Sequence, residues 1–215
     1  MFVRDEMTPN PITITPDRPI YEAQRVMKEN HIRHLPVVTS KGALVGLVTR
    51  TSLDDALPSS LTTLSIWELN YQLNKITVSE AMVKDVITVA EDVPIEEAAR
   101  IMLEKKIGSL VVTRGNRLVG IITDVDLMRT MTELLGARHP GLRVTLLVPD
   151  REGQLALITS AVAEQNGYIA ALGTYPSDEP LKWWVMLKVR FVDRAALIKK
   201  FREMPEIELL DVREN

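Results

Sequence analysis

The chain contains two copies of one unit, and this internal duplication restricts its fold more than any other feature. Matching segments follow one another in the same order in both copies. The matched pairs are Asp5–Met7 with Glu80–Met82, Pro11–Ile14 with Val86–Val89, Pro19–Ala23 with Pro94–Ala98, Leu35–Val38 with Leu110–Thr113, and Gly46–Thr49 with Gly120–Thr123. A self-match of this length and order indicates one supersecondary unit used twice.

Each copy predicts a β-α-β-β-α unit, so the predicted fold class is α+β. A short extended segment comes first in each copy, and Ile87 lies in the second of these segments. Apolar residues at helical spacing predict helices over Ile20–Asn30 and Ile95–Lys105. In the first copy two β-rich runs follow, Leu35–Val38 and Leu44–Val48, and a last helix comes after them.

The end of the second copy carries the residues with the clearest chemistry. The apolar strand Leu118–Ile122 runs directly into a helix at Thr123, and Asp126 follows three residues later. Backbone N–H groups in a first helical turn favour phosphate, and a carboxylate there can accept hydrogen bonds from both hydroxyls of a ribose. The same Thr-x-x-Asp spacing is also that of a helix capping box, so the residues alone leave both interpretations open.

The first copy differs at this position. Thr49 corresponds to Thr123, but Ser52 stands where the second copy has Asp126. A serine hydroxyl does not accept from two ribose hydroxyls as a carboxylate does. We therefore expect one competent nucleotide site per chain, or two unequal ones.

The duplicated segments carry a resemblance to a known family. The two copies are similar to a tandem pair of CBS domains, modules named after cystathionine β-synthase. The residues behind this resemblance are Met7-Thr8, Ala81-Met82, Leu35–Val38, Gly46–Thr49 and Gly120–Asp126. In that family, two copies pack across their sheets into one pseudo-symmetric module, and the clefts between them bind AMP, ADP, ATP or S-adenosylmethionine.

The resemblance implies a nucleotide site, and we name its expected members. They are Thr123, Asp126, Ile87, Thr49, Arg33 and His34. Arg33 and His34 are included because basic residues just before this strand often reach ligand phosphates in CBS pairs. The same two residues also fit a solvated helix end that complements the helix macrodipole, and both interpretations stay open.

The third segment of the chain, 141–215, has a different pattern. Its predicted order is β-α-β-β-α-β, which is ferredoxin-like. The predicted strands are Leu142–Val148, Tyr168–Thr174, Trp183–Phe191 and Ile207–Val212, and the predicted helices are Gln154–Asn166, ended by Gly167, and Asp193–Phe201.

This third segment resembles an ACT domain, a small-molecule sensor found in amino-acid metabolism. The resemblance rests on Val148–Leu155, a strand-turn-helix with a glycine in the turn, and on Gly167 after the first helix. It implies pairing through the sheets and an amino-acid-type effector near the glycine turn. The candidate effector contacts are Asp150, Gly153 and Gln154.

The sequence therefore predicts four parts. They are CBS domain 1 (1–56), a helical linker (57–77), CBS domain 2 (78–136) and an ACT domain (141–215). Within the linker, Ser65 and Glu68 have the spacing of a capping box, so we expect a linker helix that docks on the CBS pair.

The composition argues against several classes of function. The chain has no cysteine, which rules out disulfides, thiolate catalysis and cysteine-ligated zinc. Its net charge is −3 and no basic stripe occurs, so we expect no nucleic-acid partner. There is no signal-peptide core and no apolar run of about 18 residues, so we expect a cytoplasmic protein without a membrane span.

The order CBS-CBS-ACT resembles the acetoin-utilisation regulatory (AcuB-like) proteins of bacteria. The resemblance implies a regulatory sensor and homodimer that acts on an unidentified protein, with no required cofactor and no metal. One alternative is a scaffold or interaction module with degenerate sites, which Ser52 motivates. Another is a nucleotide-hydrolysing enzyme, although the sequence contains no catalytic motif that requires one.

Overall fold

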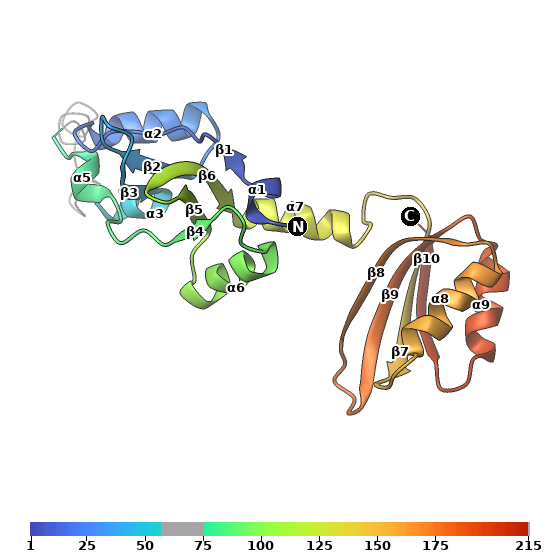
Figure 1. Cartoon of the computed structure of the whole chain (residues 1–215). Coiled ribbons are helices and arrows are strands. Elements are labelled where there is room, and N and C mark those ends of the chain that lie inside the picture. The colour runs from blue at the N-terminus through green and yellow to red at the C-terminus, as the bar shows by residue number, and fades with distance from the viewer. Residues whose placement is uncertain (57–74, 215) are drawn as a thin grey trace, which may run out of the picture. The chain divides into compact units, whose positions relative to one another are not determined.

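The computed structural model describes residues 1–56 and 75–214 and divides the chain into two compact units. The first unit is Met1–Leu127 and the second is Met128–Asn215 (Figure 1). The predicted helix with Ser65 and Glu68 lies outside the described residues. Within the described ranges, no helix is long and apolar enough to cross a membrane.

The first unit contains the predicted β-α-β-β-α order twice. In the first copy the elements are α1 (Val3–Glu6), β1 (Thr8–Pro9), α2 (Ile20–Glu29), β2 (His34–Val38), β3 (Leu44–Thr49) and α3 (Arg50–Asp55). In the second copy they are α5 (Val78–Ala81), β4 (Thr88–Ala90), α6 (Ile95–Lys105), β5 (Ser109–Arg114), β6 (Arg117–Thr123) and α7 (Asp124–Leu134). The extended segment before α2 is weaker than its counterpart β4, because it forms only a single parallel bridge, between Ile14 and Val37.

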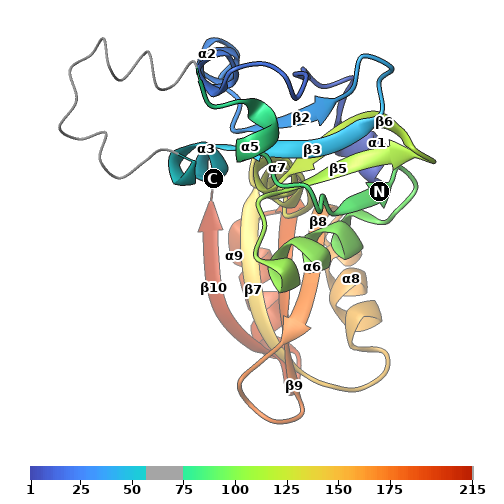
Figure 2. The ribbon, with the colours of Figure 1, turned by 90° about the vertical axis from the view of Figure 1, so that its left-hand side faces the viewer.

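Two small sheets form the centre of the first unit. One sheet has the strand order β1-β6-β5-β4 and the other pairs β2 with β3. Helices α2 and α6 lie on the outer sides of these sheets (Figures 1 and 2). Between the sheets, Leu47 from one copy packs with Val111 and Ile121 from the other. The two copies therefore share one apolar interface across their sheets.

The two copies also exchange their leading segments. Thr8 in β1 pairs with Ile121 of the second copy, and Val83 forms the reciprocal bridge with Leu47 of the first copy. Val3 of α1 is buried in the core of the second copy, whereas Val78 of α5 is buried in the core of the first. Each core is thus completed by the other copy, and neither is closed by its own sequence.

Two glycines permit this exchange. A Cβ atom on Gly120 would lie 2.3 Å from the Sδ atom of Met7, and one on Gly46 would lie 2.3 Å from the Sδ atom of Met82. Both distances are far inside van der Waals contact, so a side chain at either position would force the methionine side chain of the other copy's leading segment to move. In both copies, the glycine therefore packs against the methionine from the leading segment of the other copy.

The second unit has the β-α-β-β-α-β order that the sequence predicts. Its elements are β7 (Leu142–Pro149), α8 (Gln154–Glu164), β8 (Tyr168–Pro176), β9 (Lys182–Arg190), α9 (Arg194–Glu203) and β10 (Glu208–Glu214). The sheet is antiparallel, with the order β10-β7-β9-β8. Helices α8 and α9 cover one face of it (Figure 1). The core includes Leu146, Ile158, Leu187 and Phe201, which are contributed by both helices and the sheet.

The helix ends in this unit follow from local sequence. Asp193 caps α9, because its side chain accepts a hydrogen bond from Ala196 N at 2.8 Å. After α8, Asn166 takes the left-handed conformation with φ of 55°, and Gly167 follows it. Glycine is needed at 167 for space, since a Cβ atom there would lie 2.5 Å from Cγ1 of Val192 and 2.6 Å from Cγ1 of Val162.

Candidate functional site

A pocket of about 280 Å³ lies in the first unit beside the start of α7, and we call it the α7 pocket. Three separated segments line it: Thr8, Pro11 and Ile12; His31, Ile32, Arg33 and His34; and Ile121, Thr123, Val125 and Asp126. The segments come together because β1 pairs with β6 and because β2 follows α2. Four of the six predicted nucleotide-site residues, Arg33, His34, Thr123 and Asp126, therefore share one pocket.

The two remaining predicted residues, Thr49 and Ile87, do not line the α7 pocket. Thr49 occupies the position in the first copy that Thr123 has in the second. Ile87 is partly buried against the core of the second copy. In the repeat, Ile87 corresponds to Ile12, which does line the pocket.

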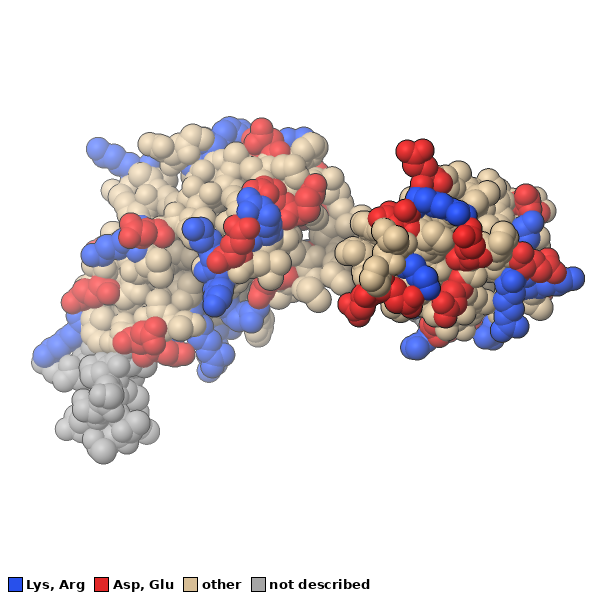
Figure 3. Space-filling view, turned by 90° about the horizontal axis from the view of Figure 1, so that it is seen from below, with Lys and Arg blue, Asp and Glu red and all other residues tan. Residues whose placement is uncertain are grey.

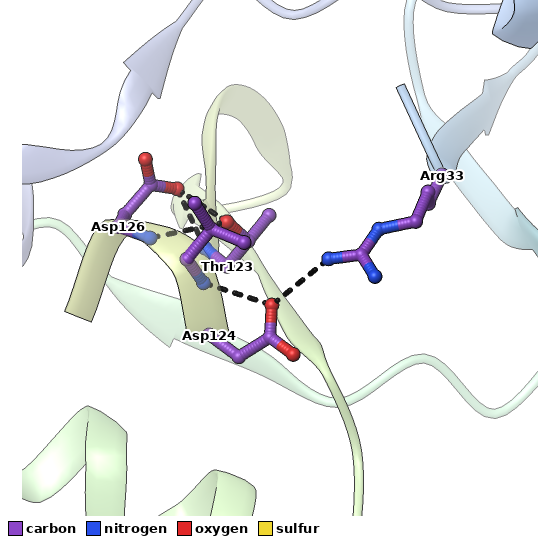
Figure 4. Close-up of polar contacts among 5 residues, drawn as sticks. Arg33, Thr123, Asp124 and Asp126 are labelled. Carbon is purple, nitrogen blue, oxygen red and sulfur yellow. Dashed lines mark hydrogen bonds and ion pairs between the residues drawn. The ribbon is translucent and has the colours of Figure 1, made fainter. Parts of the chain in front are cut away.

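Thr123 and Asp126 form a reciprocal cap at the start of α7 (Figure 4). Thr123 donates twice to Oδ2 of Asp126, from its backbone N at 2.9 Å and from its Oγ1 at 2.7 Å. In return, Asp126 N donates to Oγ1 of Thr123 at 3.4 Å. A carboxylate offers about four acceptor positions, so capping the helix is compatible with accepting from a ligand. The side chain of Asp126 is thus held in one orientation and is only 5% exposed.

The corresponding turn of the first copy uses its hydroxyl groups differently. Ser52 N donates to Oγ1 of Thr49 at 3.0 Å, and Thr49 N donates to Oγ of Ser52 at 3.0 Å. The Ser52 hydroxyl then donates its proton to the Thr49 carbonyl oxygen at 3.1 Å. Since a hydroxyl has only one proton and takes part in the cap as well, Ser52 has little capacity left for a ribose.

Arg33 and His34 supply the basic side of the α7 pocket. Nη2 of Arg33 lies 3.4 Å from Oδ1 of Asp124, across from the start of α7 (Figure 4). Burial holds the pKa of His34 below its usual range, the nearby Arg33 guanidinium lowers it further, and Asp124 acts in the opposite direction. The lowered pKa of His34 favours its neutral form, so Arg33 supplies the positive charge of this pair.

A second predicted site forms a pocket of about 470 Å³ in the C-terminal unit. The candidate effector contacts Asp150, Gly153 and Gln154 all line this pocket, together with apolar side chains that include Trp183 and Val185. Gly153 has φ of 82°, a backbone conformation that favours glycine in the turn before α8. With its amide oxygen turned toward Arg151, the buried Gln154 accepts from Nε of that residue at 2.6 Å.

Sequence reasoning missed several residues that line the α7 pocket. Ile12 could have been found, because the repeat aligns it with Ile87, which was selected. Thr8 and Pro11 carried no such signal, since they reach the pocket only through the exchanged pairing of β1 with β6. Among the described residues, no group of three or more His, Asp or Glu side chains is arranged to hold a metal ion.

Comparison with solved structures places the first unit among known folds. An acetoin-utilisation protein (AcuB) from Vibrio cholerae is 31% identical, with a TM-score of 0.54 over 64% of this chain and 95% of that one. The CBS domain pair of protein MJ0100, bound to 5′-methylthioadenosine and S-adenosyl-L-methionine, is 31% identical over 64% and 98%, with a TM-score of 0.52. CBSX2 in complex with AMP is 26% identical over 60% and 95%, with a TM-score of 0.51.

Curated relatives share the same part of the chain. A homoserine O-acetyltransferase from Methanohalobium evestigatum is 35% identical over 133 residues, which is 61% of this chain and 24% of that protein. An L-aspartate semialdehyde sulfurtransferase from Methanocaldococcus jannaschii is 34% identical over 129 residues, or 60% and 23%. The chain spans about a quarter of the length of these two relatives. The family model of the CBS domain matches residues 3–59 and 78–133, one match for each copy, and the chain therefore belongs to the CBS domain family.

Proposed function

We propose that this protein is a regulatory sensor that binds an adenosine nucleotide in the α7 pocket. The observation that carries the proposal is the meeting of Thr123, Asp126, Arg33 and His34 in one pocket, although they come from opposite ends of the duplicated region. Similar structures hold AMP or S-adenosyl-L-methionine, which supports an adenosine ligand.

The lining of the pocket suits the parts of a nucleotide. Asp126 accepts from the ribose hydroxyls, and its orientation is already set by the cap to Thr123. Pro11, Ile12 and Ile121 offer apolar surface for the base. Arg33 faces the phosphate, which displaces Asp124 as its ionic partner.

We further propose that the C-terminal unit is an ACT-type effector domain. Its strand and helix order and the pocket around the Gly153 turn support this assignment. An amino acid suits the site because the Asp150 carboxylate can accept from an ammonium group while Trp183 and Val185 contact an apolar side chain. The protein then acts as a homodimer that carries the ligand signal to a regulated protein, without catalysis of its own.

The basis for this regulatory role is the CBS pair itself. The enzymes among the curated relatives match this chain over about a quarter of their own length, so their activities belong to those proteins. Acidic and basic side chains are also interspersed on the face drawn in Figure 3, which offers no broad basic surface for nucleic acid. Ligand binding can regulate a partner only if it favours one arrangement of the protein over another.

The decisive experiment is calorimetric titration with AMP, ADP, ATP and S-adenosylmethionine. The most informative variant is Asp126→Ser, because it copies the first-copy turn, in which the Ser52 hydroxyl accepts from Thr49 N. We expect saturable binding by the wild-type protein and at least about tenfold weaker binding by this variant, or roughly 1.4 kcal/mol.

Ser52→Ala is the matched control, since it alters the equivalent turn of the first copy and leaves the α7 pocket intact. Ser52→Ala should bind the ligand that the wild-type protein binds most tightly, and its affinity for that ligand should equal that of the wild type. If none of the four ligands binds the wild-type protein, the scaffold alternative replaces the sensor proposal. If Asp126→Ser and Ser52→Ala lose the same amount of ligand affinity, the assignment of the site to the α7 pocket is refuted.

A further inference from the structure

A second pocket adjoins the α7 pocket within the first unit. It has a volume of about 360 Å³ and lies between α2 and α3, and we call it the α2–α3 pocket. Its lining residues are Gln24, Met27, Lys28, Ile32, Arg33, Arg50, Leu53 and Asp54. Ile32 and Arg33 line both pockets. Arg33 is therefore the charged side chain that the two pockets have in common.

The α7 pocket alone is small by the measure of known small-molecule sites. Small-molecule sites commonly measure about 300 to 1,000 Å³. The α7 pocket, at about 280 Å³, falls just under this range. A ligand larger than a nucleoside needs additional space, and the α2–α3 pocket provides it on the other side of Arg33.

The charges of the α2–α3 pocket favour an anion. Three cations, Lys28, Arg33 and Arg50, face it, against the single carboxylate of Asp54. Among the described residues, Lys28 and Arg50 form no ion pair, and Arg33 has only its 3.4 Å contact with Asp124. Uncompensated cations around one concave site raise the local concentration of anionic ligands.

The backbone keeps two of these cations together. Arg50 N donates to the carbonyl oxygen of Arg33 at 3.2 Å, which ties the start of α3 to the residue before β2. In the second copy, Asp124 N donates to the Gly108 carbonyl oxygen at 3.0 Å in the same way. The two copies thus make equivalent backbone hydrogen bonds at equivalent positions, but Asp124 is acidic where Arg50 is basic, and Gly108 has no side chain where Arg33 is basic.

The cations belong to the first copy alone. In the repeat, Lys28 corresponds to Leu103, Arg33 to Gly108 and Arg50 to Asp124. All three positions lose their positive charge in the second copy, and one of them, Asp124, carries a negative charge instead. The chain therefore concentrates cations beside one of its two pseudo-equivalent sites, the one that also has Asp126.

We propose, resting on the proposed function, that the ligand is an adenosine polyphosphate whose nucleoside lies in the α7 pocket and whose terminal phosphates enter the α2–α3 pocket. Its first phosphate meets Arg33, and the following phosphates meet Arg50 and Lys28. Charge-assisted hydrogen bonds to these side chains add affinity with each phosphate. The site therefore discriminates by the length of the phosphate chain, and S-adenosylmethionine gains nothing from the second pocket.

The test compares adenosine, AMP, ADP and ATP by calorimetry on the full chain in magnesium-free buffer. We expect ATP to bind at least about tenfold more tightly than AMP, which corresponds to roughly 1.4 kcal/mol. The double variant Lys28→Gln/Arg50→Gln should bind AMP within about twofold of the wild-type affinity and lose the advantage of ATP.

The matched control is Lys41→Gln/Lys105→Gln, which removes the same amount of charge from exposed positions outside both pockets. It should keep the preference for ATP. Two results would overturn this inference without refuting the nucleotide-sensor proposal. One is equal affinity of the wild-type protein for AMP and ATP, and the other is an equal loss of AMP affinity and ATP affinity in Lys28→Gln/Arg50→Gln. Absence of binding by all four compounds would overturn this inference, and S-adenosylmethionine would be the remaining candidate ligand of the proposed sensor.

Discussion

At the scale of single residues, the start of α7 has two roles in one hydrogen-bonded turn. Asp126 caps the helix through Thr123, and it also lines the α7 pocket. The capping and ligand-binding interpretations of this motif therefore do not exclude each other. The cap holds the carboxylate in one orientation, which would lower the entropic cost of binding the proposed ligand.

His34 permits a prediction about protonation at this site. Burial and Arg33 lower the pKa of His34 in the folded protein, so the unfolded chain takes up this proton at a higher pH than the folded chain does. The contribution of His34 to stability is accordingly complete above about pH 6.5 and is lost as the pH falls below that value. A bound phosphate favours the charged ring and should raise the pKa of His34.

The measurement is an NMR titration of the imidazole signals, with His34→Asn to identify the His34 resonance among the three histidines. We expect a pKa below about 6.5 without ligand and a higher value in saturating AMP. The free protein should also lose less stability between pH 7.5 and pH 5.5 in His34→Asn than in the wild type. If AMP leaves the pKa of His34 unchanged, the phosphate does not bind beside His34.

At the scale of secondary-structure elements, the exchange of leading segments holds the two copies together. It depends on the close contacts of Gly46 with Met82 and of Gly120 with Met7. We expect Gly120→Ala and Gly46→Ala each to destabilise the first unit by about 1–3 kcal/mol, because the new methyl group overpacks the contact. Urea denaturation followed by far-ultraviolet circular dichroism measures this loss.

Gly108→Ala is the control for the glycine variants, because a Cβ atom there meets no neighbour closer than 3.5 Å. It should change the free energy of unfolding by less than about 0.5 kcal/mol. Shortening the opposing side chain should partly rescue the defect, so that Gly120→Ala/Met7→Ala is more stable than additive losses predict. If the losses in the free energy of unfolding of the two single variants simply add in the double variant, the close contact is not the cause of the destabilisation.

Local patterns in the sequence were sufficient to predict most elements. Helix α6 has the predicted bounds, and the predicted starts of both final helices coincide with the capping residues Thr49 and Thr123. Apolar spacing and capping chemistry depend only on residues that are close together in the chain, so a single sequence is enough to recognise them. The predicted extended segment at Ile12–Ile14 forms only one bridge, because its pairing depends on a distant strand.

The candidate site was predictable where local chemistry or the family resemblance marked it. Thr123 and Asp126 were selected because they stand at the turn from an apolar strand into a helix. The contribution of Thr8 and Pro11 depends on which copy pairs with which, and a sequence alone does not contain that long-range information. The charged set in the α2–α3 pocket was missed for the same reason, since Lys28 and Arg50 meet only in the folded unit.

At the scale of the whole molecule, α7 belongs to both compact units. The division between the units falls after Leu127, inside the helix Asp124–Leu134. Its first turn carries Asp126. Beyond its last turn, Gly136 packs against the C-terminal sheet, where an added Cβ atom would lie 3.1 Å from Cβ of Ala171. A ligand in the proposed α7 site would therefore bind at the first turn of a helix whose later turns belong to the C-terminal unit.

This connection predicts that ATP binding protects β8 and β9 from amide hydrogen exchange, even though both strands belong to the C-terminal unit. Met131→Pro, at an exposed position in the middle of α7, should abolish that distant protection because proline breaks the helix at a cost of about 3 kcal/mol. It should leave ATP affinity within about twofold, since the first turn and its cap precede the break.

Met131→Ala removes the same side chain but keeps the helix, so it should retain the protection. If Met131→Pro transmits protection as well as Met131→Ala does, the signal does not travel through α7. If ATP protects only the first unit in the wild-type protein, binding in the α7 pocket is not coupled to the C-terminal unit.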